Sequence, residues 1–254
     1  MRPLVGVRLM FQRVAIVAAM EREISFLRRA MAPPDRSRGK LAVGSMKGKV
    51  VHVLRTGVGP LKTSQRLTEL LTPASPECVL SIGCAGALRS DINVGDIIIS
   101  DKLADDTLNG RAYYPSVALL ETAKECCRSL KLPFHSGCTV STSSVAATTE
   151  QKKSLAEKYG AVAVDMESAR VAAWAQDNGV SMVSIRTVSD SAVDRLPPEL
   201  ALIIDRNGRL QVGKILALFL EQPRLMPELL RLTWKFDHSL RTLQKGVMAL
   251  LASI

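Results

Sequence analysis

Short apolar runs alternate along the chain with longer amphipathic stretches, and this alternation predicts the secondary structure. Runs rich in valine and isoleucine are typical of strands buried on both faces, whereas apolar residues at every third or fourth position are typical of helices. The runs predict strands at 14–19, 49–55, 78–82, 96–100, 138–141, 161–164 and 182–190. The longer stretches predict helices at 21–31, 61–71, 119–130, 151–159 and 169–177. Strands that alternate with helices indicate an α/β fold with a mainly parallel sheet.

Two of the predicted strands lead directly into carboxylates. The sequence AVAVDMES (161–168) carries Asp165 and Glu167 just after its apolar run, and MVSIRTVSD (182–190) ends at Asp190. Active sites of open α/β folds lie at the sheet edge where the carboxyl ends of the strands meet. We therefore expect Glu167 and Asp190 to share one site at this edge. The alternative is that each acid only caps or starts the helix that follows it.

Glycine pairs follow two other predicted strands, in TGVG (56–59) and GCAG (83–86). Glycine lets backbone N–H groups approach a ligand closely, as in anion-binding turns. Neither segment has the spacing of a dinucleotide-binding or P-loop motif. Each is therefore either a ligand-binding turn or simply a tight turn.

The C-terminal segment has its own apolar pattern. One stripe at helical spacing consists of Leu225, Leu229, Leu232, Phe236, Leu240, Leu243, Val247 and Leu250. The pattern predicts an amphipathic helix that packs on the core or on a partner subunit. Flanking arginines and lysines, with Trp234 opposite the stripe, leave open an interfacial helix on anionic lipid. We accordingly divide the chain into a catalytic domain, 1–220, and a basic helical extension, 221–254.

Composition narrows the class of partner. Lysine and arginine number 34 against 24 aspartates and glutamates, which gives a net charge of +10. This charge suits an anionic partner, but it also fits a soluble protein whose surface is merely basic. Aromatic residues are only 4% of the chain and no nucleic-acid-binding module is recognisable, so a nucleic-acid-binding protein is a remote alternative.

The sequence shows neither a metal-binding motif nor a targeting segment. The five cysteines lack metal-binding spacing and the three histidines are scattered, so we expect reduced thiols, no metal and a cytoplasmic protein. Arg8 and Arg13 interrupt the N-terminal apolar stretch, and we expect no signal peptide and no membrane span.

Five motifs in a fixed order resemble those of a known superfamily. VAIVAAMEREI, SIGCAGAL, VGDIIISD, AVAVDMES and IRTVSDSA resemble the nucleoside phosphorylase and methylthioadenosine/S-adenosylhomocysteine nucleosidase superfamily, over about 14–217. The tail, with SDSAVDRLPPELALIIDRNGR and EQPRLMPELLRL, resembles the hopanoid-associated phosphorylase branch, which removes adenine from adenosylhopane. The resemblance implies a three-layer α/β fold with a central mixed, mainly parallel sheet flanked by helices. It also implies a homo-oligomer that needs no cofactor, apart from phosphate if the reaction is phosphorolysis.

The resemblance also implies roles for particular residues. Cleavage of a purine N-glycosidic bond leaves negative charge on the base and cationic character on the sugar. Asp190 would protonate N7 of the base, Glu167 would bind the ribose hydroxyls, and Glu23 would position water. The implied substrate contacts are Met166, Gly83, Cys84, Val145 and Ser189.

Two departures from the family pattern bear on substrate and nucleophile. The arginine that bacterial purine phosphorylases carry before Gly83 is missing, and Arg55 or Arg22 would have to hold phosphate instead. The missing arginine favours water over phosphate as the nucleophile. The name of the hopanoid-associated phosphorylase branch leaves phosphorolysis open. Val145 stands where methylthioadenosine nucleosidases place a phenylalanine that stacks on adenine. We therefore expect a lipid-linked nucleoside, adenosylhopane, as substrate, with methylthioadenosine or S-adenosylhomocysteine as the alternative.

Overall fold

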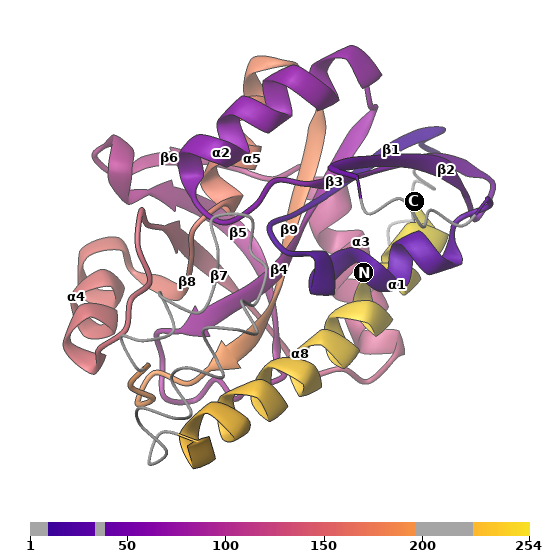
Figure 1. Ribbon diagram of the computed structural model, residues 1–254. Helices are drawn as coiled ribbons and strands as arrows, with labels where there is room; N and C mark the ends of the chain where they lie inside the picture. Colours follow the sequence, from indigo (N-terminus) through magenta and orange to yellow (C-terminus); the bar gives the residue numbers. More distant parts are fainter. Residues whose placement is uncertain (1–9, 34–38, 197–225) are drawn as a thin grey trace, which may run out of the picture.

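A mixed β-sheet forms the centre of the molecule (Figure 1). The computed structural model describes residues 10–33, 39–196 and 226–254. In these residues the strand order is β2-β3-β1-β4-β8-β7-β5-β6, and β9 pairs with both β4 and β5. The strands are β1 (Arg13–Ala18), β2 (Leu41–Met46), β3 (Lys49–Arg55), β4 (Cys78–Ala87), β5 (Ile97–Asp105), β6 (Arg111–Tyr113), β7 (Phe134–Ser141), β8 (Ala161–Asp165) and β9 (Ser181–Asp190).

The sheet is mainly parallel at its centre and closes partly on itself. Parallel pairing joins β1 to β3 and β4, β4 to β9, and β7 to β5 and β8. Antiparallel pairing joins β4 to β8 and β5 to β9, so that β4, β8, β7, β5 and β9 form a closed ring. The prediction of an α/β fold with a mixed, mainly parallel sheet is confirmed, whereas the ring was not predicted.

Alternation along the strands divides the core between two faces of the sheet. In β1, Val14 and Ile16 join one apolar cluster, while Ala15 and Val17 join another, because successive side chains point to opposite faces. The first cluster is covered by α1 (Glu21–Ala30), α3 (Val117–Ser129) and α8 (Met226–Ser253). The second is covered by α5 (Ser168–Asp177) and the π-helical turn Leu67–Leu71 that continues α2 (Pro60–Arg66). Helices therefore flank the sheet on both sides, as predicted, while α4 (Thr149–Tyr159) packs beside β7 and β8.

The C-terminal helix, α8, belongs to the core over its second half. Leu243, Val247 and Leu250 are fully buried among residues of α3, β4 and β9. Over its first half, Leu230 and Trp234 are 62% and 67% exposed. From Leu240 to Leu250 the stripe therefore packs on the core. Its first member, the 220/221 boundary and most of the tail motifs lie outside the described residues.

One predicted turn is wrong. The segment 83–86 does not leave the sheet, because β4 runs through it as far as Ala87 and pairs with β9. Glycine is favourable here because side chains from α1 and β9 approach this backbone closely. Strands β2 and β6, which are short and partly exposed, were not predicted. Within the described residues, no helix is both long and apolar enough to span a bilayer.

Candidate active site

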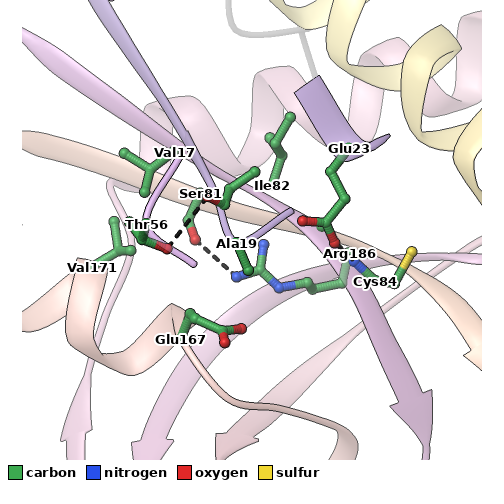
Figure 2. A pocket seen from close by; sticks show the side chains of 12 residues that line it. Val17, Ala19, Glu23, Thr56, Ser81, Ile82, Cys84, Glu167, Val171 and Arg186 are labelled. Atoms are coloured by element: carbon green, nitrogen blue, oxygen red, sulfur yellow. Dashed lines mark hydrogen bonds between the residues drawn. The ribbon is translucent and has the colours of Figure 1, made fainter. Parts of the chain in front are cut away.

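A pocket opens at the edge of the sheet where β1, β4 and β9 meet α1 and α5 (Figure 2). Its polar side chains are Glu23, Thr56, Ser81, Glu167 and Arg186. Its remaining lining residues are Val17, Ala18, Ala19, Ile82, Gly83, Cys84 and Val171. Two carboxylates and a guanidinium thus face one small space, as expected for a site at this edge.

Glu23 is fixed by backbone N–H groups. It lies in the first turn of α1, is 2% exposed, and accepts hydrogen bonds from the N–H of Met20 at 2.8 Å and of Cys84 at 3.0 Å. Burial raises the pKa of Glu23, while these N–H groups and the nearby Arg186 oppose the rise. A Cβ at Gly83 would lie 2.8 Å from Oε1 of Glu23. Glycine is therefore needed at position 83 for the carboxylate to reach the sheet.

Glu167 is held in the same way by the other glycine segment. It follows β8 and precedes α5, and its Oε1 accepts a hydrogen bond from the N–H of Gly59 at 2.7 Å. Burial raises the pKa of Glu167 to about 8, and the Asp165 and Glu23 carboxylates add to the rise. The sequence left open whether the glycine segments offer their N–H groups to a ligand or only turn the chain. Gly59 and Cys84 instead donate to the acids of the site.

Arg186 is the functional candidate that the sequence analysis missed. Figure 2 shows its side chain between Glu23 and Glu167. Its Nε donates to Asp165 at 2.7 Å and its Nη2 donates to Ser81 at 2.9 Å. Asp165, for which the motif suggested no chemical role, therefore orients the arginine. The available signal was a charged residue inside the apolar strand IRTVSD, four positions before Asp190.

Asp190 lies beside the pocket and is not among its lining residues. It is 6% exposed, accepts a hydrogen bond from Ser189 Oγ at 2.8 Å, and forms an ion pair with Lys152 Nζ at 2.6 Å. A Cβ at Gly86 would lie 2.8 Å from its Oδ2. Burial raises the pKa of the Cys84 thiol, and the charges of Glu23 and Asp190 contribute to this rise, which places Asp190 close to the site.

The other predicted site residues divide into two groups. Gly83 and Cys84 line the pocket, whereas Met166, Val145 and Ser189 do not. Val145 is 46% exposed. Ser189 also donates a hydrogen bond to the carbonyl of Ala85. The structure thus brings Glu23, Glu167 and the segment 83–84 together around the pocket. The three other predicted substrate contacts lie outside the pocket lining.

Neither arginine suggested for phosphate faces this pocket. Arg55 forms an ion pair with Glu21 at 3.1 Å, and Arg22 pairs with Asp237 of α8. Among residues 10–33, 39–196 and 226–254, no group of three or more His, Cys, Asp or Glu side chains could hold a metal ion.

The fold and this pocket define an enzyme of the nucleosidase and nucleoside phosphorylase class. The chain belongs to the phosphorylase superfamily, whose family model matches residues 13–220. The predicted superfamily and an enzyme acting on N-glycosidic bonds are thereby confirmed. The hopanoid-associated branch stays a prediction.

Relatives of known sequence or structure agree with this assignment. A 5'-methylthioadenosine/S-adenosylhomocysteine nucleosidase of Staphylococcus aureus is 28% identical over 197 residues, covering 70% of this chain and 86% of the relative. The structure of a Neisseria meningitidis nucleosidase of the same name, in complex with methylthio-immucillin-A, matches with a TM-score of 0.71 and 22% identity, covering 96% of this chain and 100% of the other. The futalosine hydrolase of Helicobacter pylori matches with a TM-score of 0.70 and 19% identity, covering 96% and 98%.

Proposed function

We propose that this enzyme hydrolyses the N-glycosidic bond of a 5'-modified adenosine and releases adenine. The observation that carries the proposal is the placement of Glu23, Glu167 and Arg186 around one pocket at the sheet edge. Paired acids of this kind are suited to a reaction that needs a general base and a stabilised cationic sugar. The named nucleosidase relatives support the same chemistry.

In the proposed reaction each acid has one task. Glu23 accepts a proton from the attacking water while the water oxygen forms a bond to C1′ of the ribose. Glu167 accepts hydrogen bonds from the ribose hydroxyls and stabilises the positive charge that develops on the sugar. Asp190 donates a proton to N7 as the C1′–N9 bond breaks and its electron pair moves to adenine. Arg186, held by Asp165, lies between the two glutamates.

Water is the proposed nucleophile because of how the nearby arginines are engaged. Arg186 is 2% exposed and donates to Asp165 and Ser81. Arg55 and Arg22 lie against Glu21 and Asp237. Phosphorolysis is therefore less well supported than hydrolysis.

Adenosylhopane is the proposed substrate, and methylthioadenosine or S-adenosylhomocysteine is the second candidate. Adenosylhopane is supported by the resemblance of the tail motifs and by Val145, which replaces a large stacking aromatic with a small, half-exposed side chain. The second candidate is supported by the names of the relatives.

An exposed patch supports contact with a lipid surface. We define the patch as Val193, Leu230, Arg231 and Trp234. Its three apolar members are 62–73% exposed, and Arg231 reaches Asp194, the neighbour of Val193. Apolar side chains beside a cation suit the interface of an anionic membrane. Such contact would bring a lipid-linked nucleoside to the enzyme, which we expect to be a homo-oligomer.

Adenine release from adenosylhopane and from methylthioadenosine, each with and without phosphate, tests the proposal. We expect release without phosphate, faster from adenosylhopane, and losses in kcat/KM of about 100-fold or more in Glu23→Gln, Glu167→Gln and Asp190→Asn. Glu121→Gln, an exposed change on α3, serves as the control and should keep full activity. Strict dependence on phosphate would overturn hydrolysis. Release that survives all three substitutions would overturn the assigned roles.

A further inference from the structure

We propose that Lys152 is a positioning residue that sets the protonation state and the orientation of Asp190. The inference rests on the proposed function, because it takes Asp190 as the acid that protonates the base. Lys152 lies on α4, a helix that supplies none of the pocket lining. Its ammonium nevertheless lies 2.6 Å from Oδ2 of Asp190.

Lys152 is buried, and its ammonium group is fully hydrogen-bonded. Its side chain is 1% exposed, and Nζ also donates to the carbonyls of Ser191 at 2.7 Å and Asp194 at 3.1 Å. An ammonium group has three protons, so these three acceptors satisfy all of them. Burying a lysine is costly unless its charge is paired and its donors are used. A helical lysine therefore reaches into the protein to hold Asp190 and the residues that follow it.

Other titratable and charged groups surround this pair. The Cys84 thiol of β4 interacts electrostatically with Asp190 and with Glu23 of α1. From the segment after β9, Asp194 accepts hydrogen bonds from the N–H of Ser191 at 2.8 Å and from Lys235 of α8 at 2.6 Å. The Asp194 carboxylate is thus engaged with its own partners, and among the described residues the cation that contacts Asp190 is Lys152.

This arrangement has opposite effects on two steps of the reaction. Before catalysis, a cation beside Asp190 favours the carboxylate and so opposes uptake of the proton that the reaction needs. During catalysis, the proton passes from Asp190 to N7, and the carboxylate that forms is stabilised by the same ammonium. Lys152 therefore opposes the first step and assists the second. It also fixes which carboxylate oxygen is left for the base.

The pH profile of kcat/KM for adenine release tests the proposal, together with the ionisation of Asp190 followed by carbon NMR of the unliganded protein. In Lys152→Met we expect the alkaline limb, and the pH at which Asp190 titrates, to rise by about one unit or more. We also expect kcat at the optimum to fall about tenfold or more. Lys152→Arg keeps the charge and should keep the alkaline limb near its original pH. Lys153→Met, at an exposed neighbour on α4, is the matched control and should change neither quantity.

Three results would overturn the proposal. The first is a titration of Asp190 that stays in place in Lys152→Met. The second is a loss of activity in that variant without a shift of the alkaline limb, which would indicate a purely structural lysine. The third is an equal shift in Lys153→Met. Should Lys152→Met fail to fold, Lys152→Gln carries the same tests. Failure of the proposed function is distinguishable, because it would abolish adenine release in the unmodified enzyme and leave the NMR titration unaffected.

Discussion

At the scale of residues, the site is built by backbone N–H groups that hold acids. Gly59 donates to Glu167 and Cys84 donates to Glu23, so each glycine segment fixes one carboxylate. These bonds favour the charged forms, yet burial raises the pKa of both acids. Burial therefore outweighs the hydrogen bonds, and the charged forms of these acids carry an electrostatic cost that a cationic sugar would relieve.

This cost predicts how stability depends on pH. Glu167 has a pKa of about 8 in the folded protein against an ordinary value of 4.5, so between these values the unfolded chain binds fewer protons than the native protein. Stability should therefore fall as pH rises from about 4.5 to 8. Glu167→Gln keeps an acceptor for Gly59 without the charge. We expect it to be more stable than the unmodified protein at pH 9, by at least ~1 kcal/mol, with the gap closing towards pH 5.

Thermal or denaturant unfolding at several pH values measures this gap. Glu77→Gln provides a control of opposite sign, because the N–H groups of Gln12 and Arg13 lower the pKa of Glu77. Its carboxylate stabilises the fold above its ordinary pKa and loses this effect as pH falls through the lowered value. The Glu77→Gln variant should accordingly be the less stable protein at neutral pH. A Glu167→Gln variant that is destabilised equally at pH 5 and pH 9 would contradict the prediction.

The predictability of these residues from sequence depended on their local pattern. Glu167 follows a strand and Glu23 stands in a recognisable motif, so the motifs could place both near the sheet edge. Lys152 could not be distinguished from its neighbour Lys153, because the difference between them arises from how α4 packs beside β7 and β8. Arg186 was visible as a charge within an apolar strand, but its partners Asp165 and Ser81 come from other strands.

At the scale of elements, α8 changes character along its length. The spacing of apolar residues predicted the helix, and it placed Leu243 on the apolar stripe and Leu230 outside it. Leu243 is fully buried and Leu230 is 62% exposed. The closure of β4, β8, β7, β5 and β9 into a ring, in contrast, depends on pairings between strands distant in sequence. No local pattern records such pairings.

The two leucines give a matched test of the packing of α8. Leu243→Ala removes a fully buried side chain from the core and should lower the free energy of unfolding by about 2–5 kcal/mol. Leu230→Ala, on the same helix, should lower it by less than about 0.5 kcal/mol. Urea unfolding of both variants measures the difference. Equal effects would show that the second half of α8 does not pack on the core.

At the scale of the whole molecule, ion pairs join distant elements around the site. Lys152 of α4 and Lys235 of α8 both bind the segment after β9, and Arg22 of α1 binds Asp237 of α8. The first half of α8 is thus tied to Asp194, in the segment that follows Asp190, while Leu230 and Trp234 face solvent. A surface that met a membrane through α8 would lie close to the acid of the site.

This geometry, with the net charge of +10, predicts binding to vesicles that contain anionic phospholipid. Removal of α8 would destroy the core, so point substitutions are the sharper test. We expect the protein to co-sediment with these vesicles at low salt and to be released as salt rises, because counterions screen its charge.

Leu230→Ser combined with Trp234→Ser should weaken vesicle binding about tenfold or more, since both side chains would lose their apolar contact with lipid. Leu61→Ser, at an 83% exposed leucine of α2 on the opposite face of the sheet, should bind as the unmodified protein does. Equal binding by all three proteins would leave the charge as the cause of any attraction and would rule out the patch as a lipid contact.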